Sequence, residues 1–366
     1  MNILVVSNMY PDETHPAYGI FVKKFCEQLE SLNISFDISV MLKRDTSFQK
    51  VVHYLSFYLF TFFRILFNKY DIIYVHYASH SGIPVIIASK FKKITIYTNV
   101  HGSDAAPENQ KQAKMQKVTI KLLEISDKII VPSQYFKTYV SEKYKICSDK
   151  IFVYPSAGVD KNVFHVFNKK VIDEEKNKYK ITRNLLTFGM AGRISAGKGW
   201  DTFVEAIKLV KNAGYKANYL IAGSGPEDMA LSKQIQDLEL ENDIIRIPLL
   251  PQSKLAIYYS VLDYFVFPTR REGESLGLVA VEAMACGIPV ISSDFAAPQY
   301  YVKNGFNGFK FKVNDANSLA QCIISRIKNN QNYFDLVSGS QLTAEEYSSE
   351  NAKKILKNII CDGIQL

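Results

Sequence analysis

Residues 274–292, ESLGLVAVEAMACGIPVIS, decide the fold that we predict for this chain. An apolar helix with a glycine near its start runs into residues 289–292, whose apolar character is typical of a buried strand. Glu274 stands before the helix and Glu282 within it. Glu282 is either a solvent-facing residue or a buried acid that binds a ligand. We favour the second because Ala, Val and Met surround it, and an unpaired buried acid costs about 2–7 kcal/mol.

The same alternation of strands and helices extends over the whole chain. Helical periods occupy residues 21–32, 134–144 and 201–212, and Ser133 is the expected N-cap of the second. This order predicts an α/β fold with parallel sheets covered by helices. The further strand-like runs are residues 2–7, 36–42, 71–76, 95–100, 128–131, 185–189, 217–222, 244–247, 264–267 and 308–311.

The length of 366 residues exceeds the size at which one hydrophobic core stops growing, so we expect two domains. The charged segment 166–184 lacks a long apolar run and predicts the boundary. The expected parts are a first domain, 1–165, a second domain, 166–343, and a helical C-terminal segment, 344–366. Two doubly wound halves place ligand sites at the carboxyl ends of their strands, in the cleft where the halves face each other.

Charge and cysteine content narrow the class of protein. The net charge is +8, and the part up to His165 holds 20 Lys and Arg against 14 Asp and Glu. This excess indicates an anionic partner, either a phosphate-bearing substrate or a membrane surface. The lysines do not alternate with aromatic residues, which argues against nucleic acid. Scattered cysteines without a CxxC pair, and a first segment that reads as a strand, predict a cytoplasmic protein.

Two motifs follow strands of the first half. Gly19 precedes a helix that begins near Ile20, where glycine lets a phosphate or sugar approach backbone N–H groups. A plain turn glycine fits this position equally well. His101 follows the strand 95–100 in the sequence HGSD. A single histidine at a strand end is more often structural, but the adjacent Gly102 and Asp104 favour a site.

Glycine-rich loops follow the strands of the second half. Arg193 and Lys198 stand in GRISAGKGW, residues 192–200, and suit a diphosphate because Arg offers a bidentate fork and Lys a point charge. The chain has neither a P-loop nor an Asp-x-Asp pair, so these cations would replace a metal ion, and we expect no metal site. A helix that begins near Leu276 or Gly277 directs its first N–H groups at an anion. Glu282 suits the ribose hydroxyls of a nucleotide.

Taken together, these motifs resemble those of the GT-B-fold, retaining glycosyltransferases of family 4. The resemblance covers nearly the whole chain and implies two Rossmann-like domains, with the C-terminal helix crossing back to the first. The matching elements are E-x7-E with its EAMACGIPVI tail, GRISAGKGW, IAGSGPE, HGSD and YPSAGVD at residues 154–160.

The resemblance also implies the chemistry. The donor is a nucleotide sugar, no metal or cofactor takes part, and the anomeric configuration is retained by front-face attack, in which the leaving diphosphate helps to take the acceptor's proton. The residues implied are Glu282 for the ribose, Arg193 and Lys198 for the diphosphate, Glu274 for the sugar hydroxyls, Gly19 in the loop that admits the donor phosphate and the acceptor, and His101 beside the anomeric centre. Gly277 and Leu278, at the start of the helix, are the expected donor-binding residues for the phosphate.

Two positions depart from the family pattern. Tyr18 replaces one of two adjacent glycines that many members carry in the first loop. Residues 296–299 read AAPQ where many members have Gly-Gly-x-x-Glu. These departures concern the contacts to the donor sugar more than the activity itself.

Membrane contact is a further hypothesis. Residues 51–67, VVHYLSFYLFTFFRILF, are interrupted by His53 and Arg64, and we favour a core helix over an interfacial one. Several lysines form either a solvated surface or a patch for anionic lipid, worth about 1 kcal/mol per lysine. The patch would attach the protein to the cytoplasmic leaflet, where a lipid-linked acceptor lies. These lysines are Lys90, Lys92 and Lys93, and Lys111, Lys114, Lys117 and Lys121, which are predicted on one helix face.

Two rival functions remain from other classes. A sugar-nucleotide epimerase of similar fold would need acid and base groups around the donor and no acceptor site. A non-catalytic partner would keep the fold and lose the chemistry. The combination of His101 with the paired acids and cations favours sugar transfer to a glycan acceptor of surface polysaccharide synthesis.

Overall fold

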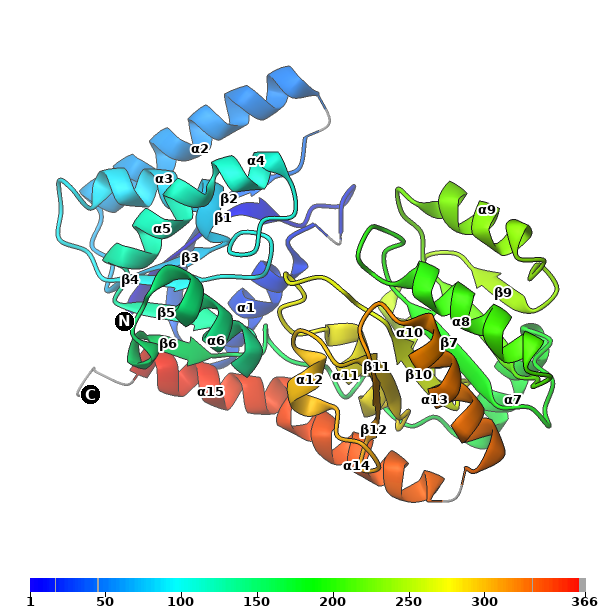
Figure 1. Cartoon of the computed structure of the whole chain (residues 1–366). Coiled ribbons are helices and arrows are strands. Elements are labelled where there is room, and N and C mark those ends of the chain that lie inside the picture. Colours follow the sequence, from blue (N-terminus) through cyan, green and yellow to red (C-terminus); the bar gives the residue numbers. More distant parts are fainter. Residues whose placement is uncertain (17, 45, 331, 362–366) are drawn as a thin grey trace. The chain divides into compact units, whose positions relative to one another are not determined.

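The computed structural model describes residues 1–16, 18–44, 46–330 and 332–361. The chain divides into two compact units, one formed by residues 1–157 with the C-terminal segment from Ala352, the other by Gly158–Asn351. Each unit contains one six-stranded sheet, and every strand pair within it is parallel (Figure 1). The prediction of two Rossmann-like α/β domains is confirmed.

The first unit has the strand order β2-β1-β3-β4-β5-β6. Its strands are β1 (Asn2–Tyr10), β2 (Ser35–Leu42), β3 (Ile72–His76), β4 (Ile96–Asn99), β5 (Lys128–Val131) and β6 (Ile151–Val153). Its helices are α1 (Ile20–Ser31), α2 (Ser47–Phe67), α3 (Ala78–Ala88), α4 (Gln110–Lys114), α5 (Gln116–Ile125), α6 (Gln134–Tyr144) and α15 (Ser349–Cys361), with a 3₁₀ turn, η1, at Ser148–Lys150.

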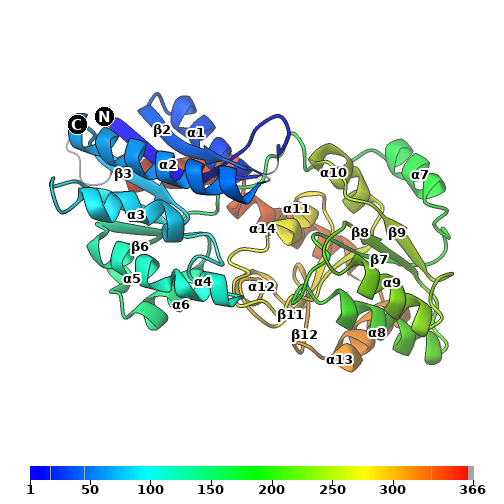
Figure 2. The same cartoon turned by 90° about the horizontal axis from the view of Figure 1, so that it is seen from above.

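Helices cover both faces of the first sheet because its strands are apolar on both sides. On one face, Leu4 and Val6 of β1 pack with side chains of α2, α3, α5 and α6. On the other face, Ile3 and Val5 pack with α1 and with Leu356 of α15. Figure 2 shows α2 and α3 of the first of these layers side by side.

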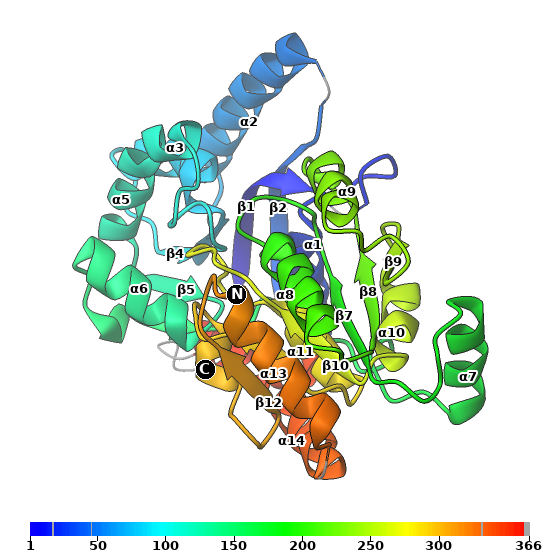
Figure 3. The ribbon, with the colours of Figure 1, turned by 45° about the vertical axis from the view of Figure 1, so that its right-hand side comes forward.

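The second unit has the strand order β12-β11-β10-β7-β8-β9. Figure 3 shows α8 and α13 side by side on one face of this sheet. Its strands are β7 (Thr187–Ala191), β8 (Asn218–Ala222), β9 (Ile244–Ile247), β10 (Tyr264–Phe267), β11 (Val290–Ser293) and β12 (Gly308–Phe311). Its helices are α7 (Lys169–Lys178), α8 (Trp200–Asn212), α9 (Asp228–Asp237), α10 (Gln252–Ser260), α11 (Leu278–Ala285), α12 (Pro298–Tyr301), α13 (Ala316–Lys328) and α14 (Tyr333–Glu346).

Three helix predictions need correction. The C-terminal stretch from 344 to 360 is not one helix, because α14 ends at Glu346 and α15 begins at Ser349. The segment with Lys111, Lys114, Lys117 and Lys121 is divided at Met115 into α4 and α5, so these lysines do not share one helix. The core interpretation of 51–67 is wrong for the outward side of α2, which is exposed.

Candidate functional site

The predicted donor residues of the second unit follow neighbouring strands. β10, β7 and β8 are adjacent in the sheet, so the loops at their carboxyl ends share one edge. Backbone hydrogen bonds join these loops: the amide of Arg270 donates to the carbonyl of Gly197 at 2.8 Å, and that of Ile194 to Ser224 at 3.1 Å. The structure therefore brings the loops 192–199, 223–227 and 268–277 together.

Lys198 and Glu274 form an ion pair across two of these loops. Lys198 Nζ lies 2.6 Å from Glu274 Oε2, and both side chains are largely buried. Burial alone would raise the pKa of Glu274, but Lys198, Arg271 and the Thr269 hydroxyl outweigh it and lower this pKa below its ordinary value. The carboxylate of Glu274 is therefore ionised at neutral pH and paired with Lys198.

Arg193 differs from Lys198 in its surroundings. Its side chain is exposed, and its guanidinium makes no hydrogen bond or ion pair with the residues that the structure describes. Gly199 fixes the other end of the same loop with φ 76°, where a Cβ would lie 1.8 Å from the carbonyl oxygen of Pro268. The loop is thus packed tightly at Gly199 and leaves the cation of Arg193 in solvent.

Two helix N-termini open onto this edge of the sheet. α8 has Gly199 as its N-cap and α11 has Gly277, both in the left-handed conformation and both without a capping side chain. Leu278 is the first residue of α11. Uncapped N–H groups at a helix start bind anions. The backbone at Gly277 and Leu278 therefore has the geometry of a helix start without a capping side chain.

Glu282 is buried inside α11, with 4% of its surface exposed, so it is not a solvent-facing helix residue. The hydroxyl of Tyr259 donates to Glu282 Oε2 at 3.3 Å. Burial, and then the charge of Glu282, raise the pKa of Tyr259 well above its ordinary value, so this phenol keeps its proton. Tyr259 thus orients one carboxylate oxygen of Glu282.

The first unit contains the other two predicted residues, and they lie near each other. Gly19 is the left-handed N-cap of α1, with φ 72°, and has no room for a Cβ against the backbone of Met9. Phe21, two residues further on, has its ring 4.1 Å from the ring of His101. The glycine turn and the histidine therefore share the carboxyl edge of the first sheet.

His101 is paired with a second histidine. His101 Nε2 lies 3.0 Å from Nδ1 of His76, the last residue of β3. Burial lowers the pKa of His101 to about 3, and burial together with the charge of His101 lowers the pKa of His76. Both rings are neutral at pH 7, so one N–H donates to the nitrogen of the other ring.

Asp104 of the HGSD motif is engaged by the backbone. One carboxylate oxygen accepts from the amides of His101 and Gly102 at 3.0 and 2.9 Å, and the other accepts from the amide of Ala78 at 2.9 Å. Asp104 is 1% exposed. It holds the His101 loop against the start of α3 and is a positioning residue.

Sequence reasoning missed several supporting residues. His76 stands in no recognisable motif, although it ends a strand adjacent to the one before His101. Arg270 and Asp201 form a bidentate pair at 2.8 and 2.7 Å that ties the loop after β10 to α8. Their charges alone gave no signal, because the two residues are far apart in sequence.

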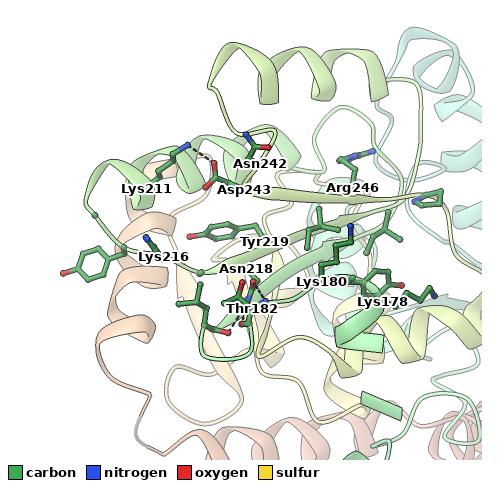
Figure 4. Close-up of a pocket in the computed structure, with 18 residues that line it drawn as sticks. Lys178, Lys180, Thr182, Lys211, Lys216, Asn218, Tyr219, Asn242, Asp243 and Arg246 are labelled. Carbon is green, nitrogen blue, oxygen red and sulfur yellow. Dashed lines mark hydrogen bonds and ion pairs between the residues drawn. The ribbon is translucent and has the colours of Figure 1, made fainter. Parts of the chain in front are cut away.

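A pocket of about 760 Å³ lies in the second unit beside the loop 223–227, because its lining residue Arg246 donates to the carbonyl of Gly223 at 3.5 Å. It is lined by the end of α7, the turn before β8 and the edge strand β9 (Figure 4). Lys180, Tyr219 and Arg246 are among its lining residues. None of the predicted donor residues lines it, so this hollow is not the predicted donor site.

Models of two known protein families match long parts of the chain. Residues 171–342 match the family described as "Glycosyl transferases group 1", and residues 37–161 match "Glycosyltransferase Family 4". The chain therefore belongs to the glycosyltransferases of group 1, also described as family 4.

Curated relatives match the chain over part of their own length. An uncharacterized glycosyltransferase of Methanocaldococcus jannaschii is 29% identical over 71% of this chain and 66% of the relative. The UDP-Gal:alpha-D-GlcNAc-diphosphoundecaprenol alpha-1,3-galactosyltransferase of Escherichia coli is 30% identical over 70% of this chain and 66% of its own. CapM of Staphylococcus aureus, a capsular polysaccharide biosynthesis glycosyltransferase, is 25% identical over 53% of this chain and 50% of its own. The chain thus spans between half and about two thirds of these relatives.

Solved structures match the whole fold. The Anabaena protein HepE in complex with UDP superposes with a TM-score of 0.77 at 18% identity, over 99% of this chain and 100% of that one. Sucrose-phosphate synthase of Thermosynechococcus elongatus superposes with a TM-score of 0.80 at 18% identity, over 99% and 98%. At this identity the likeness shows the fold alone, and the predicted GT-B fold is confirmed.

Proposed function

We propose that this chain is a retaining, metal-independent glycosyltransferase that moves a sugar from a nucleotide-sugar donor to a glycan acceptor. The proposal rests mainly on one edge of the second sheet, where two uncapped helix N-termini stand beside the Lys198–Glu274 ion pair. This edge combines a positive field for a diphosphate with an ionised carboxylate for hydroxyl groups.

The donor is held by groups of different chemistry. Glu282, oriented by Tyr259, accepts from the ribose hydroxyls. The diphosphate binds the N–H groups at Gly277 and Leu278 and the cations of Lys198 and Arg193. Glu274 accepts from hydroxyls of the transferred sugar. These cations and helix dipoles supply the positive charge that a divalent ion supplies in metal-dependent sugar-nucleotide enzymes.

Transfer breaks the bond between the anomeric carbon and the diphosphate oxygen and forms a bond from the acceptor oxygen to that carbon. Negative charge grows on the leaving diphosphate, and Lys198 and the N–H groups of α11 stabilise it. The acceptor's proton passes to the leaving diphosphate on the same face, which retains the anomeric configuration. His101 is neutral and offers a hydrogen bond beside the anomeric centre, not a charge.

The acceptor that we propose is a lipid-linked sugar of surface polysaccharide synthesis at the cytoplasmic leaflet. The names of two relatives support it: one acts on a diphosphoundecaprenol-linked sugar, and the other belongs to capsular polysaccharide biosynthesis. The basic first half of the chain fits an anionic membrane surface.

The experiment is a screen of UDP-, GDP- and ADP-sugars with an undecaprenyl-diphosphate sugar acceptor, in the presence of EDTA. We expect one donor to be turned over, with a product whose anomeric proton coupling equals that of the donor. An inverted product would refute retention, and loss of activity with EDTA would refute metal independence. An epimerised donor formed without acceptor would identify the rival epimerase function.

A further inference from the structure

The outward face of α2 is unusually apolar for a helix in contact with solvent. Among the described residues, twenty large apolar side chains are exposed, and eight of them belong to this one helix. These eight, called the α2 face below, are Phe48, Val51, Val52, Leu55, Leu59, Phe60, Phe63 and Phe67. Scattered exposed apolar residues are ordinary, but a contiguous patch marks an interaction surface.

Helical geometry shows that the α2 face is separate from the side that packs on the sheet. Phe57, Thr61 and Ile65 are buried, and their spacing of four places them along one side of the helix. Leu55, Leu59 and Phe63 have the same spacing and lie on the opposite side, with 58%, 58% and 48% of their surfaces exposed. α2 is therefore apolar all round, which a water-facing helix does not require.

The patch extends onto the neighbouring chain segment. The ring of Phe91, 71% exposed, lies 5.9 Å from the ring of Phe62. Lys92 donates to the carbonyls of Ile65 and Leu66, the last turn of α2, at 2.8 and 3.3 Å. The end of the helix and the Phe91 turn are thus fixed to each other and present one surface.

The charge around the α2 face is positive. The helix contains Lys50 and Arg64 and no acidic residue. Exposed lysines flank it at positions 43, 69, 90 and 93. Two described acids of nearby strands and turns are engaged: Asp37 with Arg64, and Asp71 with the chain's N-terminus. An apolar strip bordered by cations fits an anionic lipid surface, because the side chains enter the acyl region while lysines reach headgroup phosphates.

We infer that the α2 face inserts into one leaflet of an anionic membrane and anchors the first unit there. The helix has the length and composition of a membrane span, but its other side is part of the core through Phe57 and Ile65, so it lies in the interface and does not cross. A second copy of the chain is a poorer partner, because pairing two α2 faces would bring their flanking lysines together.

The anchor is connected to the candidate site of the same unit. α2 follows β2 and runs back along the sheet, so its first turns lie at the carboxyl edge that contains Gly19 and His101. Tyr54 of α2 accepts from Asn8 Nδ2 at 3.3 Å, and Tyr18 donates to the carbonyl of Asn8 at 3.3 Å. Insertion would hold this edge next to the headgroups. Only the link between the membrane and a lipid-linked acceptor rests on the proposed function. Binding of the α2 face to lipid can be tested without any assumption about the sugar-transfer reaction.

The test is cosedimentation with vesicles of phosphatidylcholine and phosphatidylglycerol. The variant Leu55→Gln/Leu59→Gln/Phe63→Gln should lower the partition coefficient at least tenfold. The matched control is Met229→Gln/Leu249→Gln/Leu342→Gln, which replaces even more exposed apolar residues of the second unit and should stay within twofold of wild type. Wild-type binding should persist in part at 0.5 M salt, because insertion is not screened.

Equal sedimentation of the α2 variant and wild type, or complete release of the wild type by salt, would overturn the inference. A wild-type dimer in light scattering that the α2 variant abolishes would also overturn it, because it would assign the α2 face to a second copy of the chain. A Leu59→Trp variant gives an independent readout, since insertion should shift its emission to the blue when vesicles are added. Transfer to a short, water-soluble acceptor should be unchanged in the α2 variant. Failure of membrane binding is thereby distinguished from failure of the proposed function.

Discussion

At the scale of single residues, Lys198 and Glu274 each have two expected partners, namely each other and a part of the donor. Each side chain stabilises the other while the site is empty, and each is expected to bind a different part of the donor when it is full. An ion pair that is 18% and 12% exposed is only partly screened by solvent. Removing one member therefore affects both donor binding and the environment of the remaining charge.

Replacing Lys198 with alanine should weaken donor binding. A lost charge-assisted hydrogen bond to the diphosphate costs about 1.5–3 kcal/mol, which is about a 10- to 150-fold rise in Kd. Isothermal titration with the donor nucleotide measures this. Lys233→Ala is the matched control, because it breaks an ion pair with Asp237 that is exposed and outside the site. An unchanged Kd for Lys198→Ala would remove Lys198 from the diphosphate site.

The histidine pair predicts a pH dependence of stability. The pKa of His101 is about 3 in the folded protein against 6.5 for the free side chain, so below pH 6.5 the unfolded chain binds a proton that the folded protein does not. Stability is therefore complete above pH 6.5 and falls as pH decreases toward 3. Between pH 7 and 5 His101 should account for a loss of about 2 kcal/mol.

Urea unfolding at pH 7 and 5 measures this loss in the wild type and in His101→Gln. The variant should lose less stability than the wild type over this interval, since glutamine does not titrate. His76→Gln should act in the same direction, because burial and the charge of His101 also lower the pKa of His76. Equal losses in wild type and both variants would show that neither histidine is held neutral by the fold.

At the scale of helices and loops, the glycine at a helix start can be tested against one at a helix end. Gly199 and Gly214 have φ of 76° and 80°, so alanine is strained by about 1–2 kcal/mol at either position. A Cβ on Gly199 would collide with Pro268 O, whereas nothing lies within 4 Å of one on Gly214. Gly199→Ala should thus lose several kcal/mol in thermal unfolding and bind donor poorly, whereas Gly214→Ala should lose only the strain of about 1–2 kcal/mol. Similar losses would contradict the tight packing of the loop.

The contrast between strands and α2 shows what sequence patterns can predict. Strands such as β5 and β10 are predicted to the residue because buried parallel strands are continuous apolar runs bounded by turns. The same rule favours a core helix for residues 51–67, because apolar composition alone does not distinguish a helix that packs on protein on all sides from one with an exposed apolar side. Only the contacts show that one side of α2 lacks a protein partner among the described residues.

In the candidate site, too, residues in local motifs can be predicted from the sequence, whereas residues defined by tertiary contacts cannot. Glu274, Lys198, Gly277 and Glu282 were predicted because each stands in a local motif after a strand. His76 and the Arg270–Asp201 pair were not, because their partners come from other loops and depend on which strands are neighbours. Strand order is set by packing over the whole unit, which no short pattern contains.

At the scale of the whole molecule, the chain returns to its first unit at its end. α15 packs Ala352, Leu356, Ile359 and Ile360 into the cluster that contains Phe25 of α1 and Tyr154. Lys128 of β5 donates to the carbonyl of Ile359 at 2.6 Å. The first unit is therefore complete only after the second has been synthesised, which makes its stability depend on the last helix.

Leu356→Ala tests this dependence. Leu356 is fully buried, and replacing a buried leucine with alanine costs about 2–5 kcal/mol through lost burial and the cavity that remains. The loss should be confined to the first unit, because the contacts of Leu356 are with that unit's core. Hydrogen exchange resolved by peptide should therefore quicken in β1, β3 and β5 and stay unchanged in β7, β8 and β10. Leu342→Ala on α14, 63% exposed, is the control and should change neither set. Faster exchange in both sheets after Leu356→Ala would mean that the two units unfold as one, and that α15 stabilises more than the sheet on which it packs.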